Sequence, residues 1–248
     1  MRFFRQDIKR AFGGKGFWLS MVLLTAVFVR AIWLNTNFDG GVGMEEILTN
    51  AMALSGFTPF AAIFPVLVYS TPFCEEYHSG YLKMILTRMG WKSYGFWRML
   101  STGLAGGISM AIPFAVVSGI ACRYGTYGLA DSGYYAGTRV QQGLELYGDG
   151  YVLIGKVILG FMFGCCWALV GMAFAVWAGN RYVALLAPFV LYEVLWIALF
   201  NVPYMNPIFL VRGEELGSFG QAMLMQGLYI LVAVTAVGFG LAWRLHDE

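Results

Sequence analysis

The chain has 248 residues, of which 59% are hydrophobic and only 12% are charged, and its mean hydropathy is +0.66. Soluble domains carry roughly 25% charged residues, so this chain has too few charges to cover a water-exposed surface, and we expect it to lie in lipid. Its net charge of +2 is too small for a nucleic-acid-binding surface, which needs clustered Lys and Arg.

Six stretches are apolar enough to cross a bilayer, whose core of roughly 30 Å requires about 20 residues in helical form. They are residues 17–34, 54–73, 99–122, 157–179, 182–200 and 219–243. The first exceeds the apolar core of a signal peptide and has no small-x-small cleavage site after it, so we expect it to be retained. The sequence therefore predicts a single all-α domain, residues 1–248, with six transmembrane helices.

Proline residues interrupt the second predicted span at Pro59, Pro65 and Pro72. Proline inside a helix removes a hydrogen bond and kinks or breaks the helix. We therefore expect this span to be bent or broken, as a hinge for gating or as a static kink.

Lys and Arg set the expected orientation, because short cytoplasmic loops of membrane proteins are enriched in both. Eleven of the sixteen lie before the first span, between the second and third, between the fourth and fifth, or after the sixth. Eight of the fourteen acidic residues, including Asp39, Asp131, Glu214 and Glu215, lie in the other loops or at the span ends beside them. Both termini are therefore expected in the cytoplasm.

The outer loop and the fourth span each leave two interpretations open. The loop at residues 123–151 is rich in Gly and Tyr, and either caps the bundle at headgroup level or contacts substrate. The fourth span carries small residues at about four-residue spacing, which pack closely against a helix of the same fold or of a second chain. These small residues are Gly155, Gly160, Gly164, Ala168 and Gly171.

Charged residues within or beside the spans are few. Glu193 is the only carboxylate in the middle of a span, and such a group faces a cavity or pairs with a cation. It is a candidate for the substrate path, or for pairing with Arg30 or Lys156. Those two cations are otherwise expected to extend to the outer headgroups.

The four cysteines indicate no metal or disulfide framework. They are Cys74, Cys122, Cys165 and Cys166, without CxxC spacing, and we expect buried free thiols.

Residues 74–98 are polar although they lie between two strongly apolar stretches, and helical spacing gives them two faces. The polar stripe consists of Glu76, Gly80, Lys83 and Thr87. The neighbouring apolar face consists of Tyr77, Tyr81, Met84 or Ile85, and Met89. A helix of this kind, expected to end at Gly90, lies along an interface with its polar face toward water or a partner.

The residue order around this segment resembles the permease subunits of bacterial type-2 ABC exporters (ABC-2 type). The matching positions are Phe73, Glu75, Glu76, Gly80, Leu82, Leu86, Arg88 and Arg98. Members of that family often have a proline before the arginine and a lysine at the head of the third span, where this chain has Thr87 and Arg98. The basic N-terminus also fits the resemblance, which implies an interfacial N-terminal helix.

In that family the segment after the second span is a cytoplasmic coupling helix that docks on the ATP-binding subunit. The resemblance therefore implies that residues 74–98 contact ABC ATPase subunits, and that a second permease chain, identical or a sister subunit, shares the plasma membrane. The implied ATPase-coupling residues are Glu75, Glu76, Tyr77, Gly80, Lys83, Leu86 and Arg88. The chain has no GxxxxGK[ST] phosphate loop. ATP and Mg are therefore expected in the partner, with no cofactor, metal or enzymatic activity in this chain.

The resemblance implies export as the function. The few charges in the spans favour an amphipathic or hydrophobic cargo, such as a peptide, a drug or a lipid. A membrane-embedded hydrolase would need a metal constellation, paired aspartates, or Ser and His inside the bundle, and the predicted spans contain neither Asp nor His. A passive channel or a membrane scaffold remains the alternative, since only the coupling-like segment speaks against it.

Overall fold

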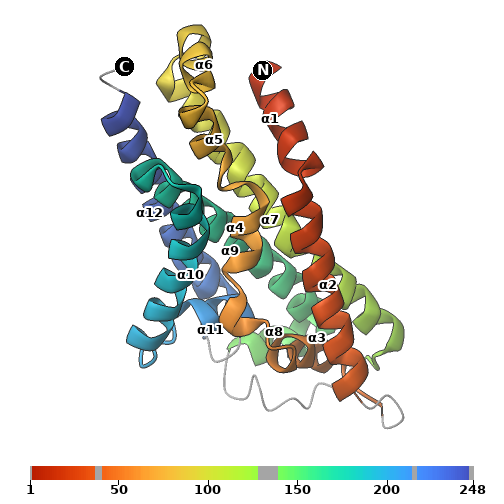
Figure 1. Ribbon diagram of the computed structural model, residues 1–248. Coiled ribbons are helices and arrows are strands. Elements are labelled where there is room, and N and C mark those ends of the chain that lie inside the picture. The colour runs from red at the N-terminus through yellow and green to blue at the C-terminus, as the bar shows by residue number, and fades with distance from the viewer. Residues whose placement is uncertain (1, 37–40, 128–138, 214–216, 246–248) are drawn as a thin grey trace.

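The computed structural model describes residues 2–36, 41–127, 139–213 and 217–245. Apart from an isolated bridge between Gly43 and Thr126, these residues form helices and their connections (Figure 1). The predicted all-helical class is therefore confirmed. Part of the 123–151 loop and the loop acids Asp39, Asp131, Glu214 and Glu215 lie outside the described residues.

Five helices are long and apolar enough to cross a membrane, which indicates a multi-pass membrane protein. They are α2 (Lys15–Asn35), α7 (Trp91–Tyr124), α9 (Asp149–Ala178), α10 (Arg181–Ala198) and α12 (Phe219–Leu245). They correspond to the first and the third to sixth predicted spans, of which the fourth and fifth run one and two residues past the ends of α9 and α10. α7 and α9 begin well before the predicted starts, because Arg98 and Lys156 are buried within these helices instead of lying at the edges of loops.

The second predicted span is broken, as its prolines indicated, but its predicted bounds are wrong. In place of one helix the chain forms α3 (Met44–Leu54), the 3-10 helix η2 (Thr58–Phe60), α4 (Ile63–Tyr69) and α5 (Pro72–His78). α3 meets the η2–α4 segment at 68°. Gly56 adopts φ +69 at this bend, a conformation that favours glycine, and Pro59 lies in η2. The bent pair is long and apolar enough to supply a sixth crossing if it counts as one span.

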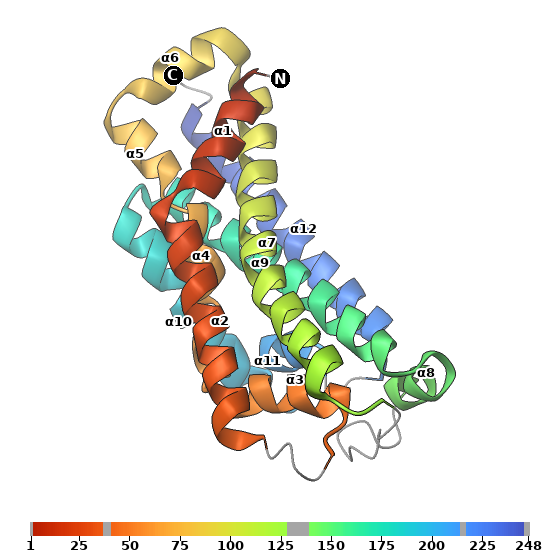
Figure 2. The same ribbon diagram turned by 90° about the vertical axis from the view of Figure 1, so that its right-hand side faces the viewer.

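The shorter helices gather at the two ends of the bundle (Figures 1 and 2). One end, called here the α6 end, carries α1 (Arg2–Gly13), α5, α6 (Tyr81–Met89) and the C-terminal part of α12. The opposite end, the α8 end, carries α3, α8 (Arg139–Tyr147) and α11 (Pro207–Arg212). α9 lies at the centre and packs against α4, α7, α10 and α12.

The small residues of the fourth predicted span serve the fold of this chain. A Cβ added to Gly164 would lie 2.3 Å from the carbonyl oxygen of Gly106 on α7, so the backbones of α7 and α9 are in direct contact there. One added to Gly171 would lie 2.6 Å from Oγ of Ser70. This face is therefore used inside the chain and does not support a second permease chain.

The described part of the outer loop covers one end of the bundle. Val140 and Leu144 of α8 are buried in a cluster with Val152 of α9 and Phe219 of α12. α8 therefore packs on the bundle, whereas its position at headgroup level and a contact with substrate stay predictions.

The cysteines are free thiols, as expected. Cys74 and Cys166 are buried and Cys165 is half-buried, but Cys122 is exposed. The prediction of burial is therefore wrong for Cys122, which is exposed near the end of α7.

Candidate functional site

Two short helices replace the single helix predicted after α4. Gly80 adopts φ +71 between α5 and α6, a left-handed conformation that interrupts a helix. Glu76 therefore lies on α5, whereas Lys83 and Thr87 lie on α6, and the predicted continuous polar stripe is wrong. Gly90, with φ +72, ends α6 as predicted.

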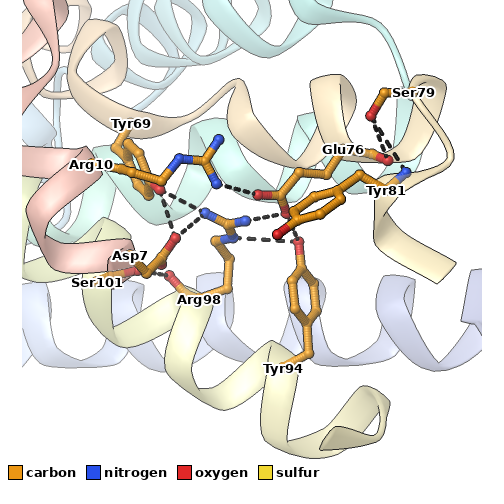
Figure 3. A network of polar contacts seen from close by, with 9 residues as sticks. All are labelled: Asp7, Arg10, Tyr69, Glu76, Ser79, Tyr81, Tyr94, Arg98 and Ser101. Atoms are coloured by element: carbon orange, nitrogen blue, oxygen red, sulfur yellow. Dashed lines mark hydrogen bonds and ion pairs between the residues drawn. The ribbon is translucent and has the colours of Figure 1, made fainter. Parts of the chain in front are cut away.

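Arg98 is 1% exposed and joins four helices at the α6 end (Figure 3). Its Nη1 donates to Oδ1 of Asp7 on α1 at 2.5 Å and to the hydroxyl of Tyr69 on α4 at 2.8 Å. Its Nη2 donates to Oε2 of Glu76 on α5. Its Nε donates to the hydroxyl of Tyr94, one turn earlier on α7, at 3.3 Å.

The two carboxylates bound by Arg98 have further donors. Glu76 accepts from the hydroxyl of Tyr94 at 2.9 Å and from Nη1 of Arg10 at 2.8 Å. Asp7 accepts from the hydroxyl of Ser101 through its second oxygen. The Arg98 network thus consists of Asp7, Arg10, Tyr69, Glu76, Tyr94, Arg98 and Ser101. It contains two guanidinium and two carboxylate groups and is electrically balanced, as a buried charge cluster requires.

Aromatic rings enclose the guanidinium group. Cζ of Arg98 lies 5.8 Å from the ring centre of Phe3, 5.4 Å from that of Tyr69 and 5.3 Å from that of Tyr94. The hydroxyl of Tyr69 also donates to Asp7 at 2.6 Å. The rings exclude water and contribute cation–π attraction, so the ion pairs act in a medium of low polarity, where they are strong.

The pKa of Glu76 reflects this environment. Burial alone would raise the pKa of this carboxyl. The charge of Arg98, together with hydrogen bonds from Arg98, Tyr94 and Arg10, outweighs burial and holds the pKa below its ordinary value of 4.5. Glu76 is therefore ionised in the folded chain at neutral pH.

Acid should weaken the fold through Glu76. Because its folded pKa is lowered, Glu76 contributes stability that is complete above pH 4.5 and is lost as the pH falls through the folded pKa. We expect the free energy of unfolding in detergent micelles to fall as the pH is lowered from 5 to 3, and Glu76→Gln to lose part of this dependence. The same pH dependence in wild type and Glu76→Gln would contradict the assignment.

The residues that the resemblance implied for ATPase coupling differ in their burial and in their contacts. Of these residues, Glu76 alone belongs to the Arg98 network, and Gly80 marks the break between α5 and α6. Glu75, Lys83 and Arg88 are exposed, whereas Tyr77 and Leu86 are partly buried. The ring of Tyr77 lies 5.1 Å from Cζ of Arg244 on α12. α5 is thus held in the bundle, while α6 turns charges outward.

Sequence reasoning missed most of the network. Asp7 is the only acidic residue among the first 38 residues, and this lone carboxylate in a basic helix was a usable signal. Arg98 was placed at the head of the third span, but it is buried inside α7. The tyrosines carried no signal, because their partners are distant in sequence.

Lys156 and Glu193 are two charged residues within or beside the spans for which the sequence predicted a position or a partner. Lys156 is fully buried and its Nζ donates to Oγ1 of Thr49 on α3 at 2.7 Å, so its expected extension to the headgroups is wrong. Within the described part of the chain, Glu193 pairs with neither Arg30 nor Lys156, and its Oε1 is buried without a hydrogen-bond partner. Its role in a substrate path remains a prediction.

No protein-family model matches the chain, and it matches no curated protein and no solved structure. The arrangement of its own residues therefore carries the functional proposal.

Proposed function

We propose that the chain is the membrane-spanning permease subunit of an ATP-driven exporter of ABC-2 type. A separate subunit, which binds ATP and Mg, docks on α6 from the cytoplasm. The observation that carries the proposal is the Arg98 network, which ties α5, the helix beside α6, to α1, α4 and α7. A force on α6 would therefore reach three helices of the bundle.

The arrangement of the helices supports a six-span topology with both ends in the cytoplasm. α1 and the end of α12 lie at the same end of the bundle (Figure 1), which requires an even number of crossings, with α3 and η2–α4 counted as one. The α6 end also holds most of the Lys and Arg residues, and such an end faces the cytoplasm.

The surface beside α6 has the shape and chemistry of a docking site. A recess of about 550 Å³ lies between α1 and α6, lined by Met84 and Tyr81 and bordered by Arg88. An adjoining recess of about 470 Å³ reaches Asp7 and Arg10 of the Arg98 network. A partner segment bound there would touch both α6 and the network.

The proposed coupling starts from the contacts that connect α6 to α5. A partner can drive a two-state transporter only if it binds the two states with different affinity. Oγ of Ser79 donates to the carbonyl oxygen of Glu76 at 3.3 Å and accepts from the amide of Tyr81 at 3.5 Å (Figure 3). We infer that a shift of α6 during the ATPase cycle moves α5, and that Arg98 passes this movement to α1 and α7.

The cargo is proposed to be amphipathic or hydrophobic, in keeping with the few charges in the spans, and a second permease chain completes the pathway. Transport of a small hydrophilic ion in reconstituted vesicles would contradict this cargo class. The alternative, a passive channel or scaffold, would have the same fold but would bind no ATPase subunit.

Docking can be tested by charge reversal on α6. Lys83→Glu combined with Arg88→Glu is expected to reduce the co-purified ATPase at least tenfold, because two exposed cations become acidic at the contact. The measurement is the amount of a Walker-motif subunit that co-purifies with the tagged chain from its own membrane. The matched control is Arg123→Glu, an exposed position near the α8 end.

Three outcomes separate the alternatives. Loss of the ATPase in the α6 variant alone supports docking on α6. Equal loss in the control would indicate a general defect in folding. If wild type retains no ATPase under conditions that preserve other exporter complexes, the channel or scaffold takes precedence.

A further inference from the structure

A groove lies on the outside of the bundle between α10 and α12. Both helices pack against α9 but make at most marginal contact with each other, so α9 forms the floor of a groove of about 350 Å³. Its walls include Trp167, Trp177, Leu191, Leu195, Ala233 and Ala236. We call it the α9 groove.

The surface of the α9 groove is apolar because its polar atoms are bonded within the chain. Nε1 of Trp177 donates to the carbonyl oxygen of Ala236 at 3.0 Å. The hydroxyl of Tyr229 donates to the carbonyl oxygen of Met205 at 2.5 Å. The groove extends along α9 from Cys166 to Trp177, about 16 Å at the helical rise per residue. This is about half of the roughly 30 Å hydrocarbon core, the depth of one leaflet.

Two arginines lie near the C-terminal end of α9, beyond the groove lining, and Arg181 lines a separate recess together with Glu75. Nη2 of Arg244 donates to the carbonyl oxygen of Trp177 at 3.1 Å. Arg181 is exposed at the start of α10, and its Nη2 donates to the hydroxyl of Tyr182 at 3.0 Å. Neither arginine forms an ion pair with a carboxylate of the described residues. Glu75 acts on Arg181 electrostatically without a direct ion pair.

We propose that the α9 groove binds an anionic phospholipid of the surrounding bilayer, with an acyl chain along α9 and the phosphate between Arg181 and Arg244. The apolar walls match an acyl chain, and the two cations at one end match a phosphate, as juxtamembrane Lys and Arg do at anionic membranes. The proposal rests on the chain lying in a bilayer and is independent of the proposed transport function.

The charge at the mouth can be tested by native mass spectrometry. Wild type is reconstituted in nanodiscs with equal phosphatidylglycerol and phosphatidylcholine and then released. It is expected to retain phosphatidylglycerol about thirtyfold more, the factor for two cations at about 1 kcal/mol each. Arg181→Glu is expected to abolish the preference, whereas Arg123→Glu, the same change near the α8 end, should leave it intact. Equal retention of both lipids by wild type would overturn the proposal.

The groove itself is tested by filling it. Ala236→Trp on α12 is expected to lower lipid retention at least fivefold, because an indole would occupy the space of the acyl chain. The control, Leu228→Trp, places the same side chain on an exposed position of α12 outside the groove lining. Retention that is unchanged in Ala236→Trp would overturn the proposal. So would a chain dimer that Ala236→Trp dissociates, since a second copy would then occupy the groove.

Discussion

Replacing Arg98 with methionine is expected to destabilise the chain by about 3–5 kcal/mol, the cost of breaking a buried ion pair by removing one partner. Asp7 and Glu76 are 1% and 2% exposed, and the substitution would leave them without their central counter-charge. Arg10 would still reach Glu76, so the largest loss falls on Asp7. Unfolding of the purified chain in detergent micelles, followed by denaturant titration, measures the effect.

A triple variant separates lost charge balance from lost packing. Asp7→Asn and Glu76→Gln, added to Arg98→Met, remove both uncompensated charges and should restore most of the stability, because replacing a complete buried ion cluster is often nearly neutral. Arg123→Met, at an exposed site, should change the stability by under about 0.5 kcal/mol. A triple variant as unstable as Arg98→Met would show that the guanidinium acts by packing against the tyrosines.

The same variants test the proposed coupling, because stability and the proposed signal transmission make different demands on the network. A neutral triple variant would restore a folded bundle but lacks the charge-assisted bonds that hold α1 and α5 against α7. We therefore expect it to bind the ATPase at α6 as wild type does, yet to respond to ATP with less transport. A triple variant that binds the ATPase but transports less in response to ATP would show that Arg98 transmits the movement of α6 to the bundle.

The sequence predicted the helical class and most of the long apolar helices because long apolar runs are local signals. Five helices long enough to cross a membrane follow from such runs, and the break in the second span was predicted from its prolines, which act on their own backbone. The position of Gly90 as a helix end was readable for the same reason. These features depend on residues within one or two turns of each other.

The Arg98 network could not be read in the same way, because its members come from distant parts of the chain. Asp7 and Arg98 are 91 positions apart, and Glu76 and Arg98 are 22 apart. Helical spacing placed Glu76 and Lys83 on one stripe, but Gly80 separates their helices. Lys156 was assigned to the headgroups from its place near a span end, while its burial depends on Thr49 of α3.

The close contact between α7 and α9 leads to the second large expected effect. A Cβ added to Gly106 would lie 2.4 Å from Cβ of Ala168 and 2.7 Å from the carbonyl oxygen of Gly164. Backbone atoms cannot move aside as a flexible side chain can, so Gly106→Ala must separate the two helices. We expect it to lower the free energy of unfolding by about 1–3 kcal/mol, as overpacking of a core does.

Gly119→Ala is the matched control, because Gly119 lies on the same helix and an added Cβ there meets nothing within 4 Å. Alanine is favoured over glycine in a helix by about 1 kcal/mol, so this variant should be as stable as wild type or more stable. Opposite signs for the two substitutions in denaturant titrations would show that the backbone contact, and not helix propensity, sets the cost at Gly106. Equal effects would mean that α7 and α9 are not held at this separation.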